Sequence, residues 1–328
     1  MDQTRAQWID IAKGFGIILV VWGHLIPSDA KRLIFMFHMP LFFIISGILF
    51  RESELSMAVV FKKLCSLGIP YLSFLVLFAI VPLVYRFKLS VYGISPLLME
   101  ILKIIIGGRY LGGQTGVFWF VSCLFFTQLL ASALWNLDKV WVRYWAIAFM
   151  YMLALLNSKY SGAWLPLNIN VVLCSILYFG IGIELRSRMH VAKRYFAIIV
   201  ALAVLGIVLL YHGFNNTNDM KYASYGIPVV TVVSAASVSI VILIVCQMIA
   251  KYRVVVPMSF LGRSSLFVMY MHIPVYCYLN GEFLGINAYF VFVTAVLFPA
   301  FLYFFVLKYR VLSILLIGNN RRLKSGLT

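Results

Sequence analysis

Charged residues are scarce in this sequence, and acidic residues are the scarcest. Only 11% of the 328 residues are charged, and 10 Asp and Glu stand against 27 Lys and Arg. Soluble domains carry about 25% charged residues, so no stretch here is polar enough to form one. The 63% hydrophobic residues exceed what one soluble core of this length can hold, and lipid accepts the excess. We predict an all-α, polytopic integral membrane protein whose single transmembrane domain covers residues 1–328, without a soluble domain.

Metal-binding patterns are also absent. The five cysteines are Cys65, Cys123, Cys174, Cys246 and Cys277. They have no spacing typical of a metal site and lie in or beside apolar runs, so we interpret them as packing residues and predict no metal. The net charge of +17 would suggest nucleic acid on a soluble protein. Here the basic residues cluster in short loops, so we expect contact with a lipid bilayer and none with nucleic acid.

Ten apolar runs are long enough to cross a bilayer as helices of about 20 residues. They cover residues 8–26, 33–50, 66–85, 117–136, 141–157, 169–185, 195–213, 225–250, 266–280 and 288–307. The ninth run is short and contains His272 and Pro274, which is typical of a broken or tilted helix. The sequence therefore predicts about ten transmembrane helices.

The basic residues indicate the orientation of these helices. With the N-terminus inside, 19 of the 27 Lys and Arg fall in inner segments and 8 in outer ones. Cytoplasmic loops carry such an excess of Lys and Arg. Because ten crossings return the chain to its starting side, we expect both termini in the cytoplasm.

One outer connection, from Arg86 to Gly116, is unusually long. Its apolar stretch, residues 97–106, is interpreted as an interfacial or re-entrant helix. The glycine-rich residues 107–116 follow, and glycine-rich loops can bind phosphate. A cytoplasmic nucleotide would not reach the outer side, so a lid facing the substrate, or a plain linker, is the better interpretation.

Ionisable residues inside the first span indicate a functional site. An ionisable group at the centre of a bilayer costs about 2.5–3.5 kcal/mol on insertion, so it is rarely present without a use. Lys13 and His24 are eleven residues apart, which places them on one helix face about 16 Å apart along the axis. Asp10 precedes Lys13 at the spacing of an ion pair. We expect this polar face to line a cavity within the protein.

Two further histidines, His38 and His272, lie in the second and ninth spans. Histidine exchanges a proton near neutral pH more readily than other side chains. A single buried histidine is more often a packing residue, but three together with Asp10 and Lys13 favour a functional site.

Other positions have simpler interpretations that stay open. Ser46 with its neighbour Gly47 would allow close helix packing. Trp119 would serve as an interfacial anchor. Lys62 and Lys63 would only set the topology.

The motifs, taken in order, resemble those of the membrane acyltransferase-3 family, whose bacterial members O-acylate sugars of the cell envelope. The resemblance rests on Lys13 with His24, on residues 38–47, 69–71 and 118–120, and on residues 261–272. It spans most of the chain and agrees with a ten-span topology. The family often has an Arg-x-x-Arg pattern where this chain has Lys63 and Ser66. It also has members with an extra hydrolase-like domain, and no such domain is expected here.

The resemblance implies a multi-pass enzyme of the bacterial inner membrane that uses acetyl-CoA, or another acyl-CoA, as co-substrate without a bound cofactor. Lys62, Lys63 and Arg263 would hold the donor phosphates. The acyl channel would include Asp10, Lys13, Ser46 and Trp119. The acceptor would be a hydroxyl of an envelope glycan or lipid-linked sugar. His24 would act as base, with His38 or His272 orienting it or polarising the thioester, or a covalent acetyl-histidine would form.

A transporter or flippase of a lipid-linked sugar is the alternative, because polar residues within spans also suit transport. The sequence has no inverted repeat and no paired broken helices, which many secondary transporters have. A requirement for acyl-CoA distinguishes the two functions. The oligomeric state is not predicted.

Overall fold

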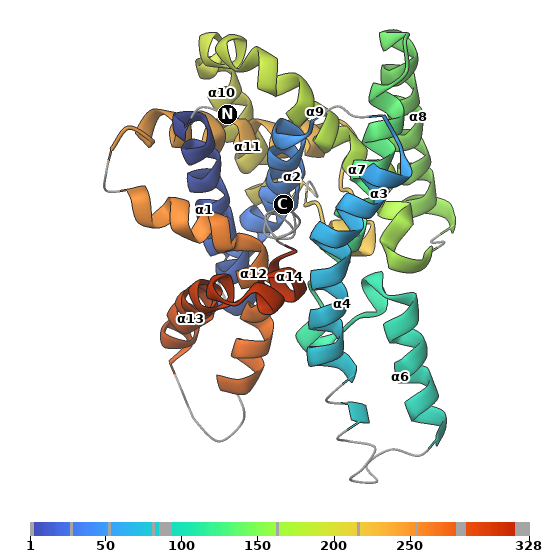
Figure 1. The fold of residues 1–328 in the computed structure, drawn as a ribbon. Coiled ribbons are helices and arrows are strands. Elements are labelled where there is room, and N and C mark those ends of the chain that lie inside the picture. Colours follow the sequence, from blue (N-terminus) through green and yellow to red (C-terminus); the bar gives the residue numbers. More distant parts are fainter. Residues whose placement is uncertain are drawn as a thin grey trace.

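The computed structural model describes residues 3–26, 29–51, 54–80, 83–84, 94–161, 164–214, 217–252, 255–279 and 287–318. Within these residues the regular elements are helices, and none is a strand (Figure 1). The all-α class is therefore confirmed. Arg86, where the long outer connection is expected to begin, lies outside the described residues.

The α-helices are α1 (Gln3–Leu25), α2 (Ala30–Leu49), α3 (Met57–Lys63), α4 (Ile69–Leu75), α6 (Ile94–Ile106), α7 (Trp119–Trp135), α8 (Val140–Leu156), α9 (Ile169–Arg194), α10 (Phe196–Tyr211), α11 (Val230–Ile249), α12 (Val256–Leu279), α13 (Ala288–Lys308) and α14 (Arg310–Ile317). Short 3-10 or π turns are η1 (Leu64–Gly68), η2 (Val76–Ile80), η3 (Gly108–Tyr110), η4 (Gly113–Thr115), η5 (Asn157–Ser161), η6 (Pro166–Asn168) and η7 (Met220–Tyr222).

Eight helical segments of the described chain are long and apolar enough to cross a membrane. They are Gln7–Leu25, Ala30–Leu49, Met57–Ile80, Gly113–Trp135, Val140–Tyr160, Pro166–Arg194, Val230–Ile249 and Ala288–Lys308. The other two expected spans correspond to α10 and α12. α10 is apolar but has only 16 residues, and α12 contains Arg263, His272 and several serines. A polytopic membrane protein is thus confirmed.

Two expected boundaries differ from the structure. The third span begins at Met57 rather than at residue 66, because Lys62 and Lys63 belong to the helix. Long basic side chains can lie along a helix and carry their charge to a polar partner, so they need not mark a loop. The ninth predicted span, residues 266–280, is part of a longer helix, since α12 has 24 residues and begins at Val256.

Two glycine contacts bring the central helices together. α1 packs on α12, and a Cβ added to Gly262 would overlap the backbone carbonyl of Asp10. α2 packs on α9, where a Cβ added to Gly47 would overlap the backbone of Phe179. Small residues permit such close approach between membrane helices. Gly47 therefore has the packing role that its position beside Ser46 suggested.

Peripheral helices expose large apolar side chains. On α8, at the upper right of Figure 1, Trp141 and Trp145 are exposed, and Ile147 and Ala154 are its buried residues. On α13, Phe301 and Phe305 are exposed. Such a surface is unfavourable in water and favourable against lipid. α6 is helical as expected, with Leu98 and Leu102 exposed, and its depth in the membrane stays a prediction.

Candidate functional site

A cavity of about 630 Å³ lies among the central helices. We call the end of the bundle where α1 begins the inner end, and the end where α1 finishes the outer end. At the inner end the cavity is lined by Lys13 and Arg263, and at the outer end by Lys31, Gly112 and Lys221. The cavity therefore follows α1 from Lys13 to His24, about 16 Å along the helix axis.

His24 reaches the cavity from α1. Its side chain is exposed, although its helix is at the centre of the bundle, because it projects into this space. The ring centroid lies 5.5 Å from that of His272 and 5.5 Å from that of Phe35. A side chain that is accessible within the protein can meet a ligand there.

His38 lies on α2 and also lines the cavity. Its Nδ1 is 2.9 Å from the backbone oxygen of Ile34. Because a carbonyl oxygen only accepts, Nδ1 carries a proton and donates it, so a neutral His38 ring has its lone pair on Nε2. The Phe35 ring contacts both His24 and His38. Its centroid is 5.5 Å from that of His24 and 4.8 Å from that of His38.

His272 is fully buried on α12 and does not line the cavity. Its Nδ1 lies 3.1 Å from the backbone oxygen of Val268 and donates to it. Nε2 is buried without a hydrogen-bond partner in the described structure. His272 thus stands behind His24 and not in contact with the cavity. No described group of His, Cys, Asp and Glu could hold a metal ion.

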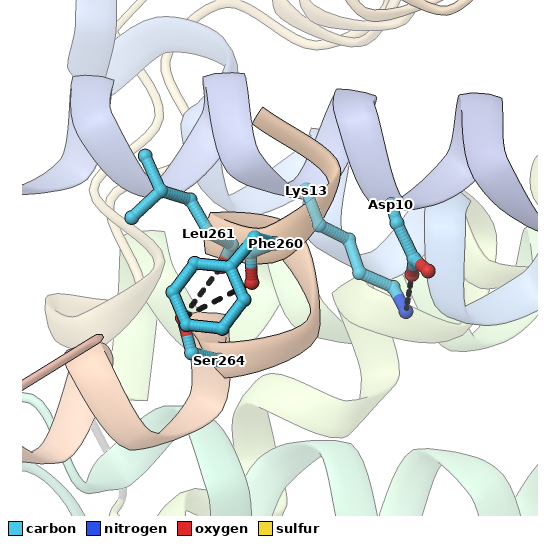
Figure 2. A network of polar contacts seen from close by, with 5 residues as sticks. All are labelled: Asp10, Lys13, Phe260, Leu261 and Ser264. Atoms are coloured by element: carbon cyan, nitrogen blue, oxygen red, sulfur yellow. Dashed lines mark hydrogen bonds and ion pairs between the residues drawn. The ribbon is translucent and has the colours of Figure 1, made fainter. Parts of the chain in front are cut away.

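Asp10 and Lys13 form an ion pair on α1, with Lys13 Nζ 3.3 Å from Asp10 Oδ1 (Figure 2). Lys13 lines the cavity, whereas Asp10 does not. Gly262 packs against the backbone of Asp10, which brings its neighbour Arg263 to the same end of the cavity. Figure 2 also shows Ser264, whose Oγ donates to the backbone oxygens of its own helix and so has a structural role.

Ser46 and Trp119, the two other residues predicted for the channel, both line the cavity. Trp119 is only 6% exposed. An interfacial anchor has to reach the membrane surface, so this position does not suit that interpretation of Trp119.

Lys62 and Lys63 lie outside the cavity lining. Lys62 is exposed. Lys63 Nζ donates to Gln128 Oε1 at 3.0 Å and lies 5.3 Å from the ring centroid of Phe50. Of the three cations predicted to bind the donor, only Arg263 therefore lines the cavity. Leu67, one helical turn after Lys63, does line it.

Sequence reasoning identified the glycine-rich residues 107–116 as a lid or linker on the outer side, but it missed the polar residues there. Asn218, Asp219 and Lys221 line the cavity there, together with Lys31 and Gly112. Burial raises the pKa of the Asp219 carboxyl and lowers the pKa of the Lys221 ammonium. An acidic residue in an outer loop was the available signal, because acidic residues are so rare in this chain.

Hydrogen bonds join the two outer loops that carry these residues. Lys221 Nζ donates to the backbone oxygen of Leu111 at 3.1 Å. Asn168 is buried between the loops: its Oδ1 accepts from the backbone N–H of Arg109 at 2.7 Å, and its Nδ2 donates to the backbone oxygen of Lys221 at 3.2 Å. The glycine-rich segment is thus held against the loop around Asn218, at the cavity mouth.

A family model described as an acyltransferase domain matches residues 6–309, which is nearly the whole chain. The matched range contains every site residue named above. Comparisons with curated proteins and with solved structures found no match.

Proposed function

Because the chain belongs to the acyltransferase-3 family and is a membrane acyltransferase, we propose that it transfers an acyl group from cytoplasmic acyl-CoA to a hydroxyl of a cell-envelope sugar. The observation that carries the proposal is the cavity, which has cations at its inner end and an accessible histidine along its length. We propose acetyl-CoA as donor, an envelope glycan or lipid-linked sugar as acceptor, and the bacterial inner membrane as the location.

The inner end suits an anionic donor. Lys13 and Arg263 line the cavity there and would bind phosphate oxygens of the donor. Lys62 and Lys63 lie outside the cavity and would meet only a part of the donor that extends beyond it. The thioester end of the donor would extend along α1 toward His24.

His24 is the group placed best to act as base. Among the three clustered histidines it alone has an exposed side chain. In the proposed step, His24 takes the proton of the acceptor hydroxyl as that oxygen bonds to the thioester carbonyl carbon. The carbon–sulfur bond breaks, and the departing sulfur takes the proton from the imidazolium. A covalent acetyl-histidine is the other route, in which His24 attacks the thioester first.

Transfer of label from radioactive acetyl-CoA to crude envelope glycans tests this proposal, with the purified protein in liposomes. We expect label on glycan with the wild-type protein and a rate about 10²–10⁴-fold lower with His24→Ala, the range for loss of an acid–base group. His190→Ala is the matched control, because His190 is exposed on α9 and does not line the cavity.

Three results would contradict parts of the proposal. No labelled glycan with the wild-type protein, across several acyl donors, would contradict the donor and acceptor classes. Equal rates for wild-type and His24→Ala proteins would place the base elsewhere. Movement of a lipid-linked sugar without any need for acyl-CoA would support transport instead.

A further inference from the structure

Two histidines meet where α1 and α12 continue beyond a shared glycine contact. A Cβ added to Gly14 would lie 3.1 Å from the backbone nitrogen of Gly262, so the two helices touch there. His24 and His272 each lie ten residues after the glycine of their own helix, which is about 15 Å farther along it. Their ring centroids are 5.5 Å apart. The glycine contact therefore fixes a register between the helices that brings the two rings to the same height.

His272 offers His24 a hydrogen-bond acceptor. Its Nδ1 donates to the backbone oxygen of Val268, so a neutral His272 ring has its lone pair on Nε2. That nitrogen is buried and has no partner in the part of the chain that the structure describes. Because His272 does not line the cavity, a ligand bound there does not meet this nitrogen. A buried acceptor without a partner is unfavourable, and the ring in contact with that of His272 belongs to His24.

A small rotation of His24 closes this hydrogen bond. Two imidazole rings joined by an N–H···N hydrogen bond of ordinary length have centroids about 5 Å apart, and the observed distance is 5.5 Å. His24 projects into the cavity and has room to turn, whereas His272 is fully buried and held by its bond to Val268. Hydrogen bonds of catalytic groups are often long without substrate and shorten in the complex.

His38 is less suited to pair with His24. The Phe35 ring contacts both histidines, and the described ring contacts include none directly between His24 and His38. His38 also lines the cavity, so a ligand can meet its ring. Of the two histidines beside His24, only His272 therefore has an acceptor that is out of reach of a ligand in the cavity.

We propose that His272 is the positioning residue for His24, whose ring donates one N–H to His272 Nε2 and keeps its other nitrogen free as the base. The hydrogen bond of one ring nitrogen decides which nitrogen of a histidine carries the proton. When His24 takes the proton of the acceptor hydroxyl, both of its nitrogens carry protons, and His272 stabilises the cation by accepting one hydrogen bond. His272 stays neutral, and the proton passes from His24 to the departing sulfur. The inference rests on the proposed function of His24 as base.

Two amide substitutions separate the roles of the two nitrogens of His272. His272→Asn keeps a donor near the position of Nδ1 but has no acceptor at the reach of Nε2, whereas the longer side chain of His272→Gln supplies one. We expect kcat to fall by up to about 100-fold in His272→Asn, because the base loses its orientation. The KM for acetyl-CoA should change by less than about twofold, because the lost interaction acts in the transition state. His272→Gln should recover most of the lost kcat.

Diethyl pyrocarbonate reports on His24 without any acyl transfer. The reagent acylates an unprotonated ring nitrogen, and mass spectrometry of the peptide that contains His24 gives the rate, with the full chain in nanodiscs. A partner that accepts the N–H of a histidine raises the basicity of its other nitrogen. His272→Asn should therefore slow the modification of His24 severalfold, and His272→Gln should restore it.

Two further variants complete the experiment. Ser264→Ala is the matched control, because Ser264 is buried on the same helix, donates to the backbone of its own turn and does not line the cavity. It should leave kcat and the modification rate unchanged. His272→Leu removes the acceptor and leaves an apolar side chain in its place, so it serves as the second loss variant if thermal unfolding shows that the Asn protein does not fold.

The outcomes separate the pairing from the proposed function. A wild-type rate of His24 modification in His272→Asn and His272→Leu, or a Gln variant as slow as the Asn variant, would overturn the pairing. A wild-type kcat in both loss variants would overturn its role in transfer. The expected pattern of modification without any transfer by the wild-type protein would instead contradict the proposed function and leave the pairing supported.

Discussion

The substitution Gly262→Ala probes the contact that holds α12 against α1. A Cβ on this residue would lie 2.9 Å from the Cα of Asp10 and would overlap the Asp10 carbonyl. Carbon atoms in favourable contact are about 3.5–4.0 Å apart. The two helices must therefore separate by more than about 1 Å, because the Asp10 carbonyl lies still closer to the added Cβ than the Cα does, and backbone groups cannot rotate away.

This separation should affect stability and transfer together. Overpacking costs about 1–3 kcal/mol, and the better helix propensity of Ala recovers up to about 1 kcal/mol of that. His272 lies ten residues after Gly262 on α12, and its ring is 5.5 Å from that of His24. A displacement of about 1 Å in an active site can cost about 100-fold in rate. We expect a lower unfolding temperature and a transfer rate up to about 100-fold lower.

Thermal unfolding in detergent and transfer from labelled acetyl-CoA measure the two effects. Gly16→Ala is the matched control on α1, because its Cβ would meet only side-chain atoms of Phe42 and Leu41, at 3.1–3.3 Å. Such atoms can move by a few tenths of an ångström. If Gly262→Ala has the unfolding temperature and rate of the wild-type protein, the close packing of α1 on α12 is refuted.

Three further substitutions have defined outcomes. Arg263→Ala should raise the KM for acetyl-CoA, and the effect should shrink at high salt because screening weakens the phosphate contact; steady-state kinetics at two salt concentrations measure this. Asn168→Ala removes two hydrogen bonds between the outer loops and should lower the free energy of unfolding by about 1–3 kcal/mol, seen as a lower unfolding temperature. Trp119→Ala enlarges the cavity by removing a side chain from its wall, so kcat/KM for butyryl-CoA should rise relative to kcat/KM for acetyl-CoA. An unchanged ratio would show that Trp119 does not line the acyl channel.

The sequence predicted the helices well, because an apolar run must satisfy its backbone hydrogen bonds internally in lipid. The common face of Lys13 and His24 also followed from helical periodicity. Both residues line the cavity, as expected for a polar helix face inside the protein. The packing role of Gly47 could also be predicted from the sequence, since small residues mark close contacts between membrane helices.

Features set by distant contacts were not predictable in the same way. Asn218 and Gly112 are far apart in the sequence, and they share the cavity mouth because Asn168 and Lys221 join the two outer loops. Periodicity also does not tell whether His272 lines the cavity or stands behind His24. The charge pattern also does not tell that Lys62 and Lys63 belong to a helix, whereas the structure places them at the end of α3.

We propose that one cavity connects a donor at the inner end with an acceptor at the outer end. The most direct measurement uses liposomes with labelled acetyl-CoA sealed inside and the glycan acceptor added outside, with protein-free liposomes as the control for leakage. The account predicts labelled glycan outside only when the protein is present. Labelling only when donor and acceptor share one side of the membrane would contradict it.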